Sequence, residues 1–91
     1  MIADIKKRAL HRSRILEGQM RGLEKMIEEE EYCMDIITQS LAIQKSLRSL
    51  NKLLVENHLR THVAEMFANG EEDTAVDELL KVYELNNVRG E

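Results

Sequence analysis

The chain has 91 residues, 43% of them hydrophobic, and a formal net charge of −4. This length predicts one domain, residues 1–91, whose limited buried surface favours help from a metal or a partner. A single cysteine excludes an internal disulfide and is typical of a reducing compartment. Neither an apolar run of about 18 residues nor a signal-peptide pattern is present. We therefore expect a soluble, cytoplasmic protein without a membrane segment.

The composition predicts an all-α fold. Pro and Trp are absent, aromatic residues make up 3% of the chain, and good helix formers dominate. The net acidity argues against nucleic-acid binding, but the charges are unevenly distributed. Acidic residues gather at Glu28 to Glu31 and at Glu71 to Asp73, so a basic face can exist elsewhere on the protein.

The first predicted helix runs from about Asp4 to Glu29. Apolar residues recur at alternating steps of three and four from Ile5 to Ile27, and only Arg12 interrupts this stripe. Gly18 and Gly22 either let another backbone approach closely or are simply tolerated. Six basic residues crowd the first 21 positions: Lys6, Lys7, Arg8, Arg12, Arg14 and Arg21.

The second predicted helix runs from about Glu31 to Asn69, after a break near Glu28 to Glu31. The acids at the break would suit the positive N-terminus of this helix. Its apolar stripe continues through His58 and His62, and Cys33 lies on the same side. Three further basic residues lie in its middle: Lys45, Arg48 and Lys52.

A short third helix is predicted from about Thr74 to Asn86. Gly70 would end the preceding helix in a left-handed conformation. Thr74 and Asp77 resemble a capping box, with Asp in place of the usual Glu or Gln. The inward face of this helix would consist of Val76, Leu79, Leu80 and Tyr83. The tail from Asn87 to Glu91 is expected to fray.

Cys33, His58 and His62 have a spacing that indicates a metal site shared between two chains. Cys33 precedes His58 by 25 residues, and His62 follows His58 by four. Histidines four apart lie on one helix face, a natural start for a metal site. On one helix, however, Cys33 would lie roughly 37 Å from His58. Two antiparallel copies of the helix would bring the cysteine of one chain to the histidines of the other.

The length of the second helix also favours a dimer. A helix of about 38 residues spans some 57 Å, whereas a compact chain of this size has a radius of gyration near 12 Å. The remaining helices cannot cover its whole apolar stripe. An antiparallel helical dimer is therefore expected, and a dimer of dimers is compatible with it.

One thiolate and two imidazoles suit Cu(I) or Zn(II), and Ni(II) or Co(II) if further ligands join. Taken singly, such residues more often serve packing or lie on the surface. Their joint position on an apolar stripe, where an unpaired imidazole would be costly, favours the metal. His11 has no such partner and is interpreted as a surface residue.

The remaining patterns favour DNA binding over catalysis. The sequence contains no Gly-rich phosphate loop, no Ser-His-Asp order and no His-Glu-x-x-His motif, so we expect no enzyme. The basic first helix favours a phosphate-binding face, although no helix-turn-helix signature is present. Two other classes stay open: a metal-buffering helical protein without a DNA role, and a purely structural helical oligomer.

Two segments resemble the copper-sensitive operon repressor (CsoR) family. Arg12 to Gly22, Arg-Ser-Arg-Ile-Leu-Glu-Gly-Gln-Met-Arg-Gly, resembles the signature of its first helix. Tyr32 to Gln44 is similar to the start of its second helix, and His58-Leu-Arg-Thr-His62 follows at the matching distance. The resemblance covers nearly the whole chain. It implies three-helix protomers with a long second helix, paired as antiparallel dimers in a disc-shaped homotetramer.

The family resemblance also implies a function and residue roles. The metal-free protein would bind operator DNA, and its metal would release it and derepress metal-efflux genes. The implied ligands come from two protomers: Cys33 from one, His58 and His62 from its partner. Tyr32 matches a tyrosine tied to allosteric coupling, whose acidic partner falls near Asp73 or Glu72. The implied DNA contacts are four arginines: Arg12, Arg48, Arg21 and Arg14. Ile15 stands where many relatives have an arginine.

The resemblance favours Cu(I) over Ni(II), Co(II) or Zn(II). Copper sensors commonly carry Cys-His-Cys, and here His62 takes the third position. Nickel and cobalt sensors share Cys-His-His but usually add a histidine near the N-terminus, and Met1 to Asp4 contains none. Persulfide sensors need a second cysteine, and formaldehyde sensors use an N-terminal proline. The pair Tyr32-Cys33 and the mid-helix sequence look more like the copper branch.

Overall fold

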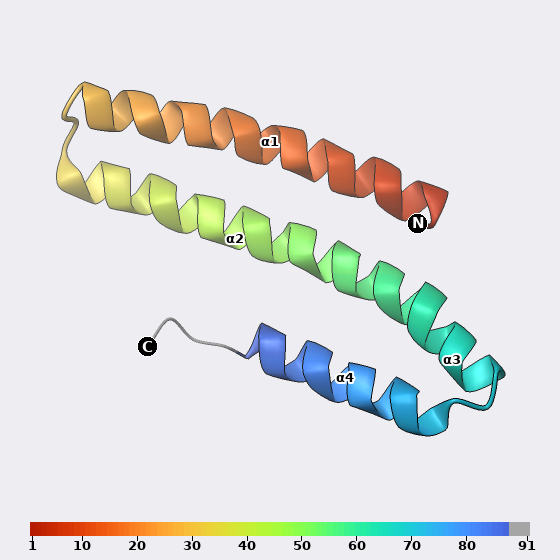
Figure 1. The fold of residues 1–91 in the computed structure, drawn as a ribbon. Helices are drawn as coiled ribbons and strands as arrows, with labels where there is room; N and C mark the ends of the chain where they lie inside the picture. The colour runs from red at the N-terminus through yellow and green to blue at the C-terminus, as the bar shows by residue number, and fades with distance from the viewer. Residues whose placement is uncertain (88–91) are drawn as a thin grey trace.

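The computed structural model describes residues 1–87, and these contain helices and turns but no strand. The elements in chain order are α1 (Ala3–Glu28), α2 (Cys33–His58), the π-helical turn η1 (Leu59–Val63), α3 (Ala64–Ala68) and α4 (Glu72–Asn86). α2, η1 and α3 form one continuous rod. α1 and α4 run antiparallel to this rod along its opposite edges (Figure 1). The prediction of an all-α fold with a long second helix is confirmed.

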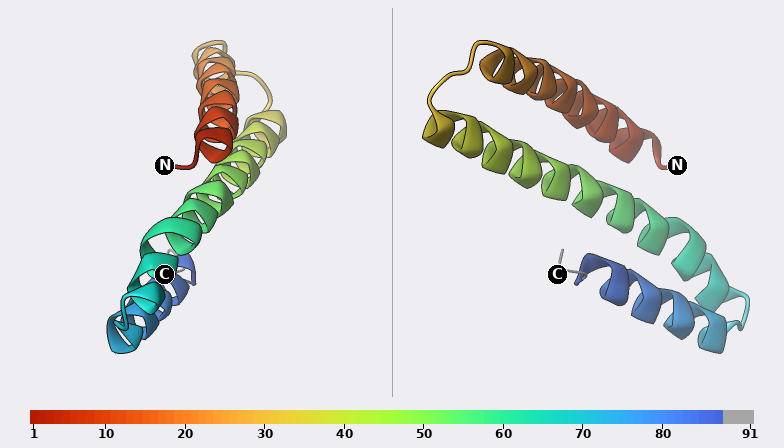
Figure 2. Two further views of the ribbon diagram at one scale, coloured as in Figure 1. Left: turned by 90° about the vertical axis from the view of Figure 1, so that its right-hand side faces the viewer. Right: turned by 60° about the vertical axis from the view of Figure 1, so that its left-hand side comes forward.

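The three rods form a layer about one helix thick. The Cα atoms extend over 57 × 33 × 13 Å, and their radius of gyration is 17.4 Å. A compact chain of this length would have about 12 Å. Two turned views show how flat the arrangement is (Figure 2). Seventeen large hydrophobic side chains of the described residues are at least 37% exposed. The single chain therefore leaves most of its apolar surface uncovered.

α1 packs against α2 through a small core near the N-terminus. Its members are Ile5, Ala9 and Leu53, with Ile2 and Leu50 packed against them. Ile5 and Ala9 lie on the apolar stripe predicted for the first helix, whereas Leu53 and Ile2 were not placed on a predicted stripe. Burying a side chain such as Ile5 or Leu53 contributes roughly 1.5–3 kcal/mol. This core fixes the pairing of α1 with the second half of α2.

Two similar turns end α1 and α3. Each places one residue in the left-handed region, Glu30 with φ 50° and Gly70 with φ 75°. In each turn the next residue donates to a carbonyl five residues earlier, as Glu31 N–H does to Met26 O at 3.0 Å. Gly70 thus ends the long rod as predicted, whereas a glutamate fills the equivalent position after α1. The connection between α1 and α2 contains no glycine because Glu30 takes the left-handed conformation there.

The predicted start of the second helix was two residues early. α2 begins at Cys33 with Tyr32 as its N-cap residue, and the acid in its first turn is Asp35. The run Glu28 to Glu31 instead forms the end of α1 and the connection, so it does not serve the N-terminus of α2.

The predicted capping box at Thr74 was wrong. α4 begins at Glu72, two residues earlier, and its N-cap Glu71 makes no side-chain capping bond. Two acids in the first turn, Glu72 and Asp73, favour this earlier start through the helix dipole. The residue that α4 buries completely is Ala75. The face predicted to point inward is exposed in the single chain: Val76, Leu79, Leu80 and Tyr83.

The tail predicted to fray comprises Asn87 to Glu91. Asn87 is the C-cap residue of α4, and residues 88–91 lie outside the described part of the chain.

Both helical glycines of α1 are tolerated without a close backbone approach. A Cβ built on Gly22 would meet Gln39 Nε2 at 3.7 Å, and one on Gly18 would meet Arg21 Nη2 at 3.8 Å. Among residues 1–87, no helix combines the length and apolar character needed to cross a membrane.

Candidate metal centre and nucleic-acid interface

Cys33 and His58 are the first and last residues of α2. Twenty-five helical steps separate them by roughly 37 Å, as the spacing predicted. Cys33 is a free, exposed cysteine, and the neighbouring Tyr32 is 71% exposed. Within residues 1–87 of one chain, no group of three His, Cys, Asp or Glu side chains could hold a metal ion. One chain alone therefore does not assemble the predicted site.

His58 and His62 lie together at the other end of α2. Their ring centroids are 5.3 Å apart, with the ring planes tilted by 41°. The His58 side chain is one-third exposed, and His62 is exposed. Two imidazoles this close, open to one side, present two of the three nitrogen and sulfur donors that the sequence predicted for the site.

The prediction of an uninterrupted α-helix was wrong after His58, because the π-helical turn η1 begins at Leu59 and contains His62. Ala64 N–H donates to Leu59 O, five residues earlier. Thr61 Oγ1 donates to Asn57 O at 2.7 Å and lies 3.4 Å from His62 Nδ1. Single π-helical turns inside α-helices often mark functional sites. The sequence shows no sign of this turn, since its residues are ordinary helix residues.

Asn57 connects this end of α2 to the start of α1. It is the buried polar residue of the described chain, and its Oδ1 accepts a hydrogen bond from Ile2 N–H at 2.9 Å. The carbonyl of Asn57 also accepts the Thr61 hydroxyl. The first residues of the basic helix are thus fixed directly beside the histidine pair.

Glu78 of α4 is the acid that contacts the histidine pair. Its Oε1 lies 3.4 Å from His58 Nε2, and both side chains are about one-third exposed. The acid predicted as the partner of Tyr32, Asp73 or Glu72, lies in the first turn of α4, and both candidates are exposed. Sequence reasoning missed Glu78. A usable signal is its position three residues after Ala75, on the face of α4 that turns toward the rod.

The arginines predicted to contact DNA lie along α1 and the middle of α2. Arg12 is half-buried, and its Nη1 donates to Ser49 Oγ across the two helices. Because Ser49 directly follows Arg48, Arg12 and Arg48 lie at the same level of the helix pair. Arg14 and Arg21 are exposed on α1. The structure thus places two of the four predicted arginines at the same level of the helix pair.

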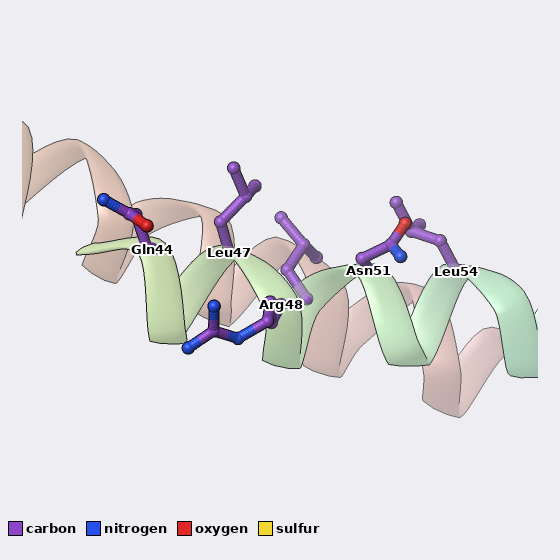
Figure 3. A pocket seen from close by; sticks show the side chains of 6 residues that line it. Gln44, Leu47, Arg48, Asn51 and Leu54 are labelled. Carbon is purple, nitrogen blue, oxygen red and sulfur yellow. The ribbon is translucent and has the colours of Figure 1, made fainter. Parts of the chain in front are cut away.

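Arg48 borders an open apolar hollow on α2. The hollow has a volume of about 470 Å³, and Leu47, Leu50 and Leu54 supply its apolar lining. The close view shows the Arg48 guanidinium extending away from Leu47 and Leu54 (Figure 3). Leu47 and Leu54 are therefore exposed on this face of α2, whereas Leu50 packs partly against the core, and Arg48 extends to the side of the face.

This combination of a flat helical layer, a histidine pair and a basic helix has a known family counterpart. The model of the metal-sensitive transcriptional repressor family matches residues 5–84. The chain belongs to this family. Because the family consists of transcriptional repressors, the expectation that the chain is not an enzyme is confirmed.

Individual relatives confirm the resemblance to copper-sensitive operon repressors. The chain is 35% identical to the copper-sensing transcriptional repressor CsoR of Bacillus subtilis over 78 residues, 86% of this chain and 77% of the relative. The CsoR of Mycobacterium ulcerans is 34% identical over 79 residues, 87% of this chain and 68% of the relative. Among solved structures, the copper-sensing repressor CsoR with Cu(I) from Geobacillus thermodenitrificans superposes with a TM-score of 0.85. It is 32% identical, and the match covers 97% of this chain and 92% of that one.

Proposed function

We propose that this protein is a copper-responsive transcriptional repressor. The metal-free form binds operator DNA, and Cu(I) releases it, which derepresses metal-efflux genes. The observation that carries the proposal is the His58–His62 pair held against Glu78 at one end of α2, with Cys33 at the other end. Family membership supports the repressor role, and the copper-sensing relatives support the metal.

The metal site forms between two copies of the chain. An antiparallel partner brings its Cys33 to the His58 and His62 of the first copy, because these residues lie at opposite ends of one rod. The exposed leucines of α2 and the exposed face of α4 support such a partner, since a chain this flat cannot cover them itself. Pairs of dimers then assemble into the tetramer.

The donor set fits Cu(I). Soft thiolate and imidazole ligands suit this ion, and the structure offers both types. Glu78 Oε1 lies 3.4 Å from His58 Nε2, so Nδ1 is the nitrogen of His58 that would be left to face the metal. Tyr32, directly before Cys33, enters the same site from the partner. Asp73 and Glu72, in the first turn of α4, are further candidates to contact the partner there.

DNA binds through phosphate contacts from four arginines, and no base-reading element is required. Arg12 is held by Ser49 beside Arg48, and Arg14 and Arg21 extend the basic surface along α1. Metal and DNA are linked thermodynamically. DNA must weaken metal binding by the same factor by which metal weakens DNA binding.

The direct test measures operator affinity with and without Cu(I), using a duplex from the promoter of the protein's own operon. We expect metal to weaken binding by roughly 5–150-fold, the usual range of allosteric coupling. Metal-free affinity should fall steeply with salt. Arg48→Ala should weaken DNA binding and keep metal affinity, whereas Lys25→Ala, at the far end of α1 beside Glu29, should change neither. Equal DNA affinity at saturating Cu(I) rejects the proposal.

His62 favours a second candidate, a nickel-, cobalt- or zinc-responsive repressor of the same family. An imidazole where copper sensors commonly have a thiolate makes the site harder and suits these divalent ions better. Competitive affinities for Cu(I), Zn(II), Ni(II) and Co(II), each read beside DNA release, separate the candidates. A metal that binds tightly but leaves DNA affinity unchanged is not the signal.

A further inference from the structure

The N-terminal half of α1 carries a basic hollow that shares no residue with the proposed metal site. Its volume is about 540 Å³, and its lining consists of Asp4, Lys7, Arg8, His11, Arg12 and Arg14. Four of these side chains are permanent cations and one is a carboxylate, on a protein whose formal net charge is −4. An excess of positive charge in a concave surface attracts anions.

Two of the cations are already engaged. Arg8 Nη1 lies 3.7 Å from Asp4 Oδ2, which neutralises the one acid of the hollow. Arg12 donates to Ser49 on α2. Among the contacts of residues 1–87, no ion pair or side-chain hydrogen bond engages Lys7, His11 or Arg14, and all three are exposed. These three side chains are therefore available to an external ligand.

Their spacing fits a nucleic-acid backbone. Lys7, His11 and Arg14 follow at steps of four and three, so they share one face of α1. They extend over about 10 Å along the helix, more than the 3.4 Å that one DNA strand rises per phosphate. The three side chains can accordingly reach more than one phosphate of a strand.

His11 gives this surface a property that lysine and arginine lack. Histidine is the residue type whose charge ordinarily changes between pH 5 and 8, and contact with a phosphate favours the protonated form of an imidazole. The charged groups around it on α1 are Lys7, Arg8, Arg12 and Arg14, with Asp4 paired to Arg8. On α2 the contact at this level is the neutral Ser49, and residues 36–55 contain no acid. Among residues 1–87, no unpaired carboxylate at this position can therefore take the place of phosphate as the partner of an imidazolium.

We propose that Lys7, His11 and Arg14 bind DNA phosphates in this hollow, and that His11 takes up a proton when DNA binds. The inference rests on the proposed repressor function and adds a proton linkage to it. DNA affinity then depends on pH as well as on metal.

The experiment follows the affinity of the metal-free protein for the promoter duplex between pH 6 and pH 8 at constant salt. Binding should be roughly fivefold tighter at pH 6 for one histidine that protonates in the complex. His11→Gln should remove this difference, and His11→Lys should bind at pH 8 about as tightly as the wild type does at pH 6. The pH slope of His11→Gln relative to the wild type isolates His11 from His58 and His62.

Salt dependence tests the phosphate contacts separately. Lys7→Gln and Arg14→Gln should each lower the slope of log affinity against log salt by about 0.9. Lys25→Gln, a matched change beside Glu29 at the other end of α1, should leave the slope unchanged. Circular dichroism checks that each exposed-site variant keeps its helical content.

The possible outcomes distinguish a failure of the inference from a failure of the proposed repressor function. A wild type that binds no promoter duplex at any pH contradicts the proposed function. A wild type that binds and is released by Cu(I), but with the same pH slope as His11→Gln, overturns the proton uptake. Weaker binding of His11→Gln by one constant factor at every pH overturns it as well.

Discussion

His58 Nε2 lies 3.4 Å from Glu78 Oε1, and this contact joins the end of α2 to the middle of α4. A histidine that binds metal through one ring nitrogen commonly donates its other N–H to a carboxylate, which fixes the ring. Any change in the position of His58 on metal binding is therefore passed to α4. The pair links the proposed metal site to a whole helix.

Glu78→Ala should weaken the coupling between metal and DNA. The expected loss in metal affinity is about 10–100-fold, and metal-free DNA affinity should stay near that of the wild type. The coupling free energy should fall well below the usual 1–3 kcal/mol. Operator affinity at saturating Cu(I) measures it. Glu84→Ala, at an exposed acid of the same helix, is the control, and equal coupling in both variants would remove Glu78 from the mechanism.

The extent of the helices could be predicted from the sequence because it depends on a regular spacing of apolar residues. The apolar stripe from Ile5 to Ile27 predicted α1 to within one residue at each end. The connection after α1 was harder, because Glu30 adopts the left-handed conformation that usually marks a glycine. The π-helical turn η1 was not predictable from its residues, because a helical turn that is wider by one residue uses residues with the same helix propensities as an ordinary turn.

The candidate site, like the fold, could be predicted from the sequence only in part. Helix arithmetic predicted that Cys33 lies far from His58 in one chain, and their places at the two ends of α2 agree with it. Glu78 was missed because its contact depends on how α4 folds back after Gly70, which no periodicity determines. The bond from Ile2 N–H to Asn57 was missed for the same reason, as it joins residues 55 positions apart.

Mixing two inactive variants should restore metal binding if the site is shared. Cys33→Ala and His58→Ala each lose one ligand type and should bind Cu(I) only weakly. A mixed antiparallel dimer still contains one complete site, formed by Cys33 of the second variant and the histidines of the first. Metal titration of the co-refolded mixture should recover this site. A mixture no better than its components would contradict a site shared between Cys33 of one chain and the histidines of another.

Leu47→Glu should dissociate the dimer. Leu47 is 55% exposed on the leucine face of α2, where the proposed partner packs. Burying a leucine contributes about 1.5–3 kcal/mol, and a buried unpaired carboxylate costs considerably more. Sedimentation should show a monomer that binds neither Cu(I) nor DNA tightly. Leu47→Met keeps the face apolar and should remain assembled, and an assembled Leu47→Glu protein would exclude this face from the interface.

Asn86 and Asn87 offer a matched test of how α4 is held. Each donates its Nδ2 to the carbonyl four residues earlier at 2.7 Å, but only Asn86 also accepts from Asn51 Nδ2, at 2.6 Å. That bond ties the end of α4 to α2, one turn from Arg48. Asn86→Ala should therefore speed hydrogen exchange in the last turn of α4 and lower the free energy of unfolding by about 0.5 kcal/mol, the low end for an exposed bond. Asn87→Ala loses the same local bond without the link to α2, so equal exchange in the two variants would show that the Asn51–Asn86 bond does not hold the end of α4.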